Sequence, residues 1–283
     1  MNTVFRGFDH PVSMAYNAGR KSLVVLHGSI GDRVSEFELK SGRTICDINM
    51  RGKFTFNTPC LGKHLAYNPL NDSVFVSVSK GTESVIEEFS LRDGKETGYR
   101  LTSSEKPLCG YVARMAPRFA FHPGLTLIMW AGSYDVETGG AFRDCFNLFA
   151  FRYPTNEMVW AYTGNDAQPN IAVDASGRSD FGFVSGDIPD PPYINFRTGS
   201  KSAAPSPISN LYRYFNRVAF ASGSNKCFIQ RGRFINVSDG LESFFTIKTD
   251  ATPSAIVFAP DLGLFLVALE KQGAIFGYNT AIF

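Results

Sequence analysis

Residues 65–98, LAYNPLNDSVFVSVSKGTESVIEEFSLRDGKETG, contain two copies of one pattern. An alternating, strand-like segment runs through the polar turn NPLND into a second one, and the turn LRDGKE later joins two more. Gly, Asp, Asn and Pro supply the backbone angles that such tight hairpin turns require. The stretch therefore predicts a meander of four antiparallel strands.

The same strand, turn and strand pattern recurs along the whole chain. A small residue repeats at one position, with intervals of 51, 54, 52, 47 and 38 residues: Ala15, Ala66, Ala120, Ala172, Ala219 and Val257. In a β-propeller the first strand of each blade crowds the central axis, where only short side chains fit. The repeat therefore predicts an all-β chain, with each unit packing on its neighbours.

A second tight turn follows in five of the six units. These turns are LKSGRT at Leu39, LRDGKE at Leu91, RYPTNE at Arg152, FRTGSK at Phe196 and VSDGLE at Val237. They complete about six four-stranded blades in one domain over residues 1–283, although a long link could hold a seventh.

The sixth unit lacks its fourth strand, because the chain stops at Phe283 soon after GAIFGYN. The segment TVFRGF, Thr3 to Phe8, alternates apolar and polar residues. We expect it to supply the missing outer strand and to close the ring, which would cover an otherwise exposed sheet edge.

Segments such as AYNPLNDSVFVSV followed by VIEEFSLRDGKETG resemble the WD-repeat, YVTN and NHL classes of propeller. The Trp-Asp and Gly-His dipeptides of true WD repeats are missing from the sequence. The resemblance implies an architecture and no activity.

Composition narrows the function classes. Charged residues make up 19% of the chain and the net charge is +2, so the sequence lacks the basic excess typical of nucleic-acid binding. No apolar run approaches the length of a membrane span and no secretory signal peptide is visible, which favours a location in the cytoplasm or in a virion. The five cysteines are scattered without a C-x-x-C pair. No catalytic residue, metal ligand or cofactor is predicted.

Two features of the connections are informative. Asn17, Asn68, His122 and Asp174 occupy the same position at the end of the first strand, which predicts that they cap turns. The long links, at 51–62, 103–116, 132–144, 186–192 and 208–215, fall on one face, where insertions cost little and contacts can evolve.

Charged and aromatic residues on these links define a candidate face for a protein partner. Acidic residues belong to units three and four, and basic residues with tyrosines belong to units one, two and five, the latter including Arg217. The candidates are Arg51, Lys53, Lys106, Tyr111, Arg114, Arg118, Tyr134, Asp135, Glu137, Asp144, Asp187, Asp190, Tyr212, Arg213 and Tyr214.

Three functions remain open. The first is a non-enzymatic subunit of a larger homo- or hetero-oligomeric assembly, similar in architecture to bacteriophage tail-nozzle propellers or another virion component. The second is a lactonase-like or sugar-acting hydrolase with a metal at the axis, for which no ligand set can be assigned. The third is an intracellular adaptor that binds peptides.

Overall fold

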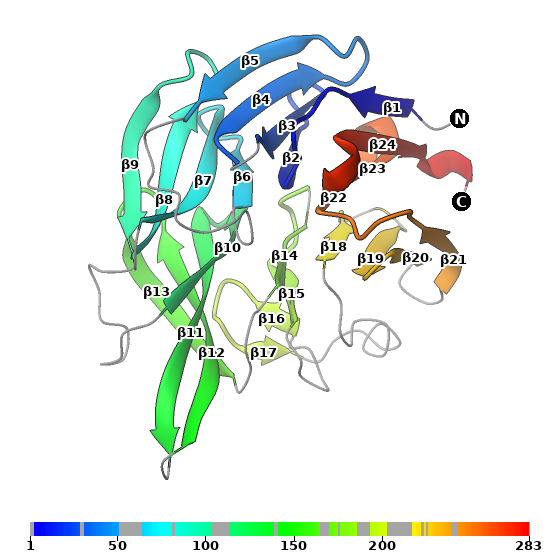
Figure 1. Cartoon of the computed structure of the whole chain (residues 1–283). Coiled ribbons are helices and arrows are strands. Elements are labelled where there is room, and N and C mark those ends of the chain that lie inside the picture. The colour runs from blue at the N-terminus through cyan, green and yellow to red at the C-terminus, as the bar shows by residue number, and fades with distance from the viewer. Residues whose placement is uncertain are drawn as a thin grey trace.

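The structure is a computed structural model of the chain. It describes residues 3–28, 31–50, 64–80, 83–102, 114–138, 141–164, 170–174, 176–185, 193–202, 217–221, 224, 226–238 and 243–282. Six four-stranded antiparallel sheets, the blades, surround a common axis (Figure 1). The described part of the chain thus confirms an all-β propeller with six blades.

Blades one to three use consecutive strands. Their strands are β2 (Ser13–Asn17), β3 (Ser22–His27), β4 (Arg33–Glu38), β5 (Thr44–Asn49), β6 (His64–Asn68), β7 (Ser73–Lys80), β8 (Glu83–Ser90), β9 (Glu96–Thr102), β10 (Arg114–His122), β11 (Leu127–Thr138), β12 (Ala141–Arg152) and β13 (Glu157–Gly164).

Blades four and five continue this order, whereas blade six combines the two ends of the chain. The elements are β14 (Asn170–Ala172), β15 (Phe181–Ser185), β16 (Tyr193–Asn195), β17 (Lys201–Ser202), β18 (Arg217–Phe220), β19 (Cys227–Arg231), β20 (Phe234–Ser238), β21 (Ser243–Lys248), β22 (Ala255–Ala259), β23 (Leu264–Leu269), β24 (Ala274–Asn279) and β1 (Thr3–Arg6), with 3-10 helices η1 (Pro260–Leu262), η2 (Glu270–Gln272) and η3 (Thr280–Ile282).

The N-terminal strand closes the ring as the sequence predicts. β1 pairs with β24, with Phe5 opposite Ile275, and both termini lie at this blade (Figure 1). The rings of Phe5 and Phe8 lie 5.6 and 5.0 Å from the ring of Phe37 in blade one. The strand therefore joins blade six to blade one by packing as well as by hydrogen bonds.

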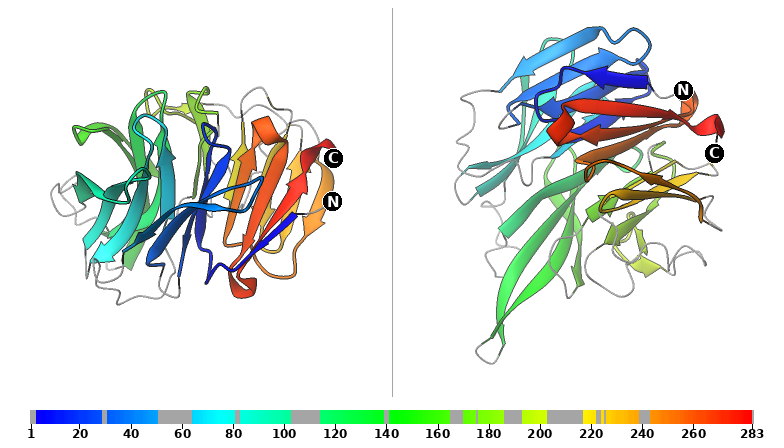
Figure 2. Two further views of the ribbon diagram at one scale, coloured as in Figure 1. Left: turned by 90° about the horizontal axis from the view of Figure 1, so that it is seen from above. Right: turned by 45° about the vertical axis from the view of Figure 1, so that its right-hand side comes forward.

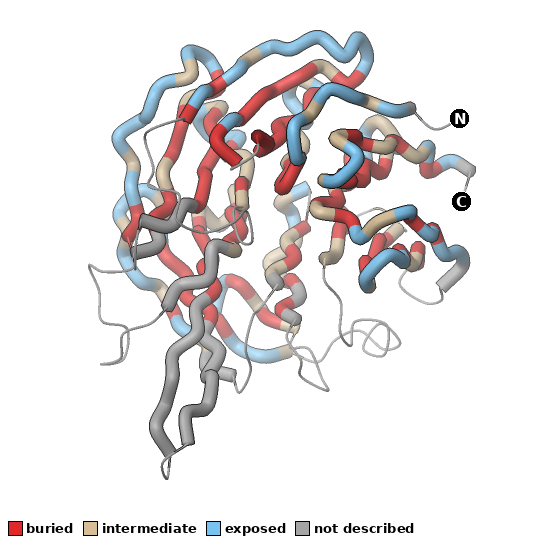
Figure 3. The backbone as a smooth tube through the Cα atoms, viewed as in Figure 1, coloured by how far each residue is buried: buried red, intermediate tan, exposed pale blue. Residues whose placement is uncertain are grey.

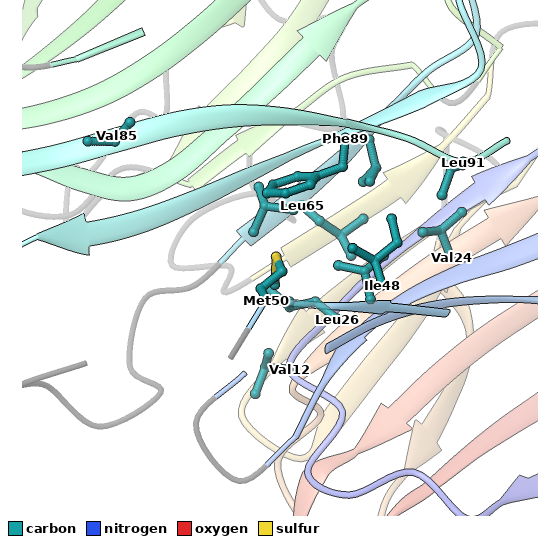
Figure 4. Packing of buried hydrophobic residues seen from close by; sticks show 12 residues of the cluster. Val12, Val24, Leu26, Ile48, Met50, Leu65, Val85, Phe89 and Leu91 are labelled. Atoms are coloured by element: carbon teal, nitrogen blue, oxygen red, sulfur yellow. The ribbon is translucent and has the colours of Figure 1, made fainter. Parts of the chain in front are cut away.

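The hydrophobic core is divided among the boundaries between adjacent blades. Figure 4 shows one such boundary, where Val24 and Ile48 of blade one meet Leu65 and Phe89 of blade two. Comparable clusters occupy the other five boundaries. Buried residues concentrate on the inner strands and exposed ones on the outer strands (Figure 3). Each blade is thus stabilised by its neighbours, as the repeat predicts.

The predicted turn caps are confirmed. The side chains of Asn17, Asn68 and His122 accept backbone N–H bonds from Arg20, Leu70 and Leu125 at 3.2, 3.1 and 3.1 Å. The Asp174 carboxylate accepts backbone N–H bonds from Ser176, Arg178 and Ser179 at 2.9–3.1 Å. One position of the repeat therefore holds the turn between strands one and two in four blades.

The predicted loop at 132–144 is wrong. β11 and β12 pair continuously up to Thr138 opposite Ala141, forming a long hairpin that projects from the ring (Figures 1 and 2). Residues 114–116 also belong to a strand, β10, rather than to a link. Alternating residues such as SYDVET favour extended strands, so the two strands continue past the blade before they turn. The other predicted links, 51–62, 103–113, 186–192 and 208–215, lie outside the described residues.

Candidate functional site

The inner strands of neighbouring blades run in the same direction along the axis, so their starts lie together and their ends lie together. Ser13, at the start of β2, accepts a hydrogen bond from the backbone of Leu65 at the start of β6, at 3.2 Å. At the other ends, Arg20 after β2 forms an ion pair with Asp72 after β6. We call the face at the strand starts the link side and the face at their ends the turn side.

A cavity of about 530 Å³ occupies the axis and is lined by all six inner strands. The repeated small position, represented by Ala15, Ala120 and Ala219, lies on its wall. Large side chains from the alternate positions of these strands, such as Phe119 and Phe258, enter the boundary clusters. The recurring small residues therefore keep the axis open, and the cavity has a size common for small-molecule and peptide-side-chain pockets.

Three nitrogen-bearing side chains line the cavity near the link side. His64 begins β6, Arg217 begins β18, and Arg118 lies on β10 within a break in the strand register between Met115 and Phe119. Each precedes the small residue of its blade by two positions, so the three residues lie at the same height along the axis. We call this group the arginine mouth.

The electrostatic environment of the arginine mouth is cationic. Burial, together with the guanidinium groups of Arg217 and Arg118, lowers the pKa of His64 to about 3. Burial and the charge of Arg118 lower the pKa of Arg217 to about 10, against a smaller opposite effect of Glu270. Both arginines nevertheless stay protonated at neutral pH, whereas His64 is neutral.

The His64 ring is held by its neighbours. Ser13 Oγ lies 3.3 Å from Nδ1 of His64, and the His64 backbone N–H donates to Ser77 Oγ at 3.0 Å. The edge of the Phe119 ring system meets the imidazole at a centroid separation of 5.5 Å and an interplanar angle of 86°. The ring orientation is therefore fixed by both blade one and blade three.

The turn-side end of the cavity has a different character. Tyr16, Tyr67, Asp174, Arg178 and Asp261 line it. Burial, followed by the carboxylate of Asp261, raises the pKa of the Tyr16 phenol. The cavity is thus basic at one end and carries both charges at the other.

The structure places one predicted partner residue, Arg118, at the arginine mouth. The backbones of Arg114, Tyr134, Asp135, Glu137 and Asp144 are described, in β10 and in the β11–β12 hairpin, where Asp135 pairs with Asp144. The remaining candidates lie outside the described residues: Arg51, Lys53, Lys106, Tyr111, Asp187, Asp190, Tyr212, Arg213 and Tyr214.

Sequence reasoning missed the contribution of His64 and Ser13. A signal was available, because His64, Arg118 and Arg217 share one offset from the repeated small residue. The prediction rested on the small position and the turn position of the first strand, whereas this signal lies two residues before the small position.

The described residues lack two kinds of feature. They contain no group of three or more His, Cys, Asp and Glu side chains arranged to hold a metal ion. No helix among them is both long enough and apolar enough to cross a membrane.

Fold and cavity define the class: the chain is a six-bladed β-propeller with an open axial cavity. The β-propeller domain of Cps50 (Swd1) from Myceliophteria thermophila is similar, with a TM-score of 0.65 and 11% identity over 99% of each chain. At this identity the likeness shows the fold alone. No protein-family model matches the chain, and no curated protein matches it in sequence.

Proposed function

We propose that this chain is a non-enzymatic interaction propeller, an adaptor that binds an extended peptide segment of a protein partner at the link-side end of its axial cavity. The observation that carries the proposal is the cavity itself, about 530 Å³ in volume and lined by all six inner strands. A pocket of this size accepts one or two side chains of a peptide whose remainder lies across the face.

The polar groups of the cavity support this use. Most of its wall is apolar, from residues such as Ala66, Ala120 and Val257, while a few polar side chains stand at its ends. A mainly apolar wall with few placed donors is typical of ligand sites, because burial supplies affinity and the polar groups supply specificity.

The other predicted functions lack a specific supporting observation. No described residue favours a bacteriophage tail or virion subunit over other assemblies. The axial hydrolase has no ligand set in the described part of the chain.

Selection from a library of random twelve-residue peptides displayed on phage tests the proposal. We expect successive rounds against the full chain to enrich related sequences. Synthetic copies should bind with a Kd in the micromolar range, measured by fluorescence anisotropy. A pocket that accepts one or two side chains buries only a limited surface area. Failure to enrich any sequence above the background of an unrelated immobilised protein would contradict the proposal.

A further inference from the structure

The arginine mouth combines features of an oxyanion site. Arg118 and Arg217 come from different blades and line the same cavity, and their charges influence each other. No carboxylate in the described part of the chain forms an ion pair with Arg217. Two guanidinium groups that line one cavity repel each other, and an anion bound between them would lower that repulsion.

The backbone at Arg118 is irregular in a way that positions its side chain. Pro117 precedes it and cannot donate a ladder hydrogen bond, and the pairing of β10 with β11 shifts between Met115 and Phe119. Irregularities of this kind re-aim side chains and are common beside binding sites.

His64 supplies a third donor of defined orientation. Ser13 Oγ accepts the Leu65 N–H and lies 3.3 Å from Nδ1 of His64, to which its hydroxyl donates in one of the two imidazole tautomers. An imidazole that accepts at Nδ1 carries its proton at Nε2 when neutral. In this tautomer the ring has one N–H left to donate, on the side away from Ser13.

We infer that the arginine mouth binds an oxyanion, a carboxylate or a phosphate, carried by the peptide ligand. Arg118 and Arg217 supply charge-assisted hydrogen bonds, and the Nε2–H group of His64 supplies a neutral one. Carboxylate and phosphate present the same acceptor chemistry to these donors. That a peptide carries the anion rests on the proposed function. That an anion binds here rests on the residues that line the cavity.

The acidic residues of the cavity do not occupy this position. Asp174 and Asp261 both follow inner strands and therefore lie toward the turn side. The oxygens of Asp174 are already used by the turn that they cap. Glu270, in η2, acts on Arg217 electrostatically and offsets part of its charge.

Histidine NMR of the intact protein tests the anion site without any substitution. The chain has four histidines, so labelled imidazole signals can be resolved one by one. Inorganic phosphate or acetate should shift the His64 signals saturably and raise its pKa, while the signals of exposed His10 should not shift saturably. Saturating phosphate and acetate that leave the His64 signals unchanged would overturn the inference.

Variants and three peptide pools identify the source of the anion. Nine-residue pools with a fixed central phosphoserine, glutamate or glutamine are compared by anisotropy. Preference for the phosphoserine pool or for the glutamate pool identifies phosphate or carboxylate as the natural group. Either preference over glutamine should reach at least about tenfold and disappear in Arg118→Gln and Arg217→Gln.

Arg178→Gln is the matched control, because it removes the same charge from the turn-side end of the cavity. Its affinity should stay within about twofold of the wild type, as should its melting temperature. Arg217→Lys keeps the charge and should restore part of the preference, which separates anion binding from a folding defect. Equal loss in Arg178→Gln would overturn the inference.

The outcomes separate the two proposals. Peptides that bind without charge preference leave the interaction function standing and remove the oxyanion site. Phosphate that perturbs His64 while no peptide binds leaves the anion site standing and removes the peptide function.

Discussion

Asn68 Nδ2 donates a 2.9 Å hydrogen bond to the carboxylate of Glu88, whose side chain is almost fully buried. The inner strand of blade two is thereby tied to its third strand. Blade one repeats the arrangement, with Asn17 donating to Glu36 at 2.9 Å. A buried carboxylate with several donors is stable only while they remain, because desolvation of an unpaired charge costs more than a single hydrogen bond contributes.

We expect Asn68→Ala to lower the free energy of unfolding by about 1–3 kcal/mol, because it removes a donor from a buried charge and a turn cap as well. Urea unfolding monitored by circular dichroism measures the change. Leu70→Ala, in the exposed turn that follows, is the control and should change stability by less than about 0.5 kcal/mol. Equal effects of the two substitutions would show that the buried network contributes nothing specific.

Removal of residues 1–8 should destabilise the ring. The deletion takes away β1 and the Phe5 and Phe8 side chains that pack on Phe37. We expect a loss of at least about 3 kcal/mol, since two half-buried phenylalanines and a strand edge become exposed. Differential scanning calorimetry should show a melting temperature about 6–12 °C lower.

Val4→Ala is the control for that deletion, because Val4 lies on the same strand and is 38% exposed. It should leave the melting temperature within about 2 °C of the wild type. A deletion variant with the same melting temperature as the full-length protein would mean that blade six is stable without its outer strand.

The sequence predicts the ring well because its signal is periodic. One small residue recurs on the inner strands around the axis, and the Asn17-type position recurs at the turn, so blade positions could be aligned without a structure. The β11–β12 hairpin was predicted as a loop because its polar residues and two glycines at 139–140 resemble a link. Local composition does not tell where a strand stops when its pairing partner is equally long.

The free energy of unfolding should decrease as the pH is lowered, and protonation of His64 in the unfolded chain accounts for part of this decrease. Its pKa is about 3 in the folded protein and 6.5 in the reference state, so only the unfolded chain binds this proton between those values. Proton uptake by the unfolded state favours unfolding. The free energy of unfolding therefore decreases as the pH falls from about 6.5 toward 3. The slope from this group is about 1 kcal/mol per pH unit.

His64→Gln should flatten that slope, because glutamine carries no group that titrates in this range. Urea unfolding of the wild type and of the variant at several pH values between 3.5 and 7 measures the two slopes. Parallel curves for the wild type and His64→Gln would contradict the assigned His64 pKa.

The candidate site was only partly predictable. Arg118 was identified from its place near a link, but the partnership with Arg217 and His64 depends on strands from three blades meeting around one axis. Their sequence separation exceeds 50 residues at each step, so the cavity exists only when the ring is closed. The break in the register of β10 that contains Arg118 likewise follows from pairing rather than from local sequence.

The location of the bound peptide tests the account most directly. Peptides enriched against the full chain would be synthesised with a photoreactive benzophenone, cross-linked and mapped by mass spectrometry. We predict cross-links at 64–67, 118–121 and 217–220, which line the cavity on three blades. Cross-links confined to the outer strands β5, β9 and β13, or to the β11–β12 hairpin, would contradict binding at the axis.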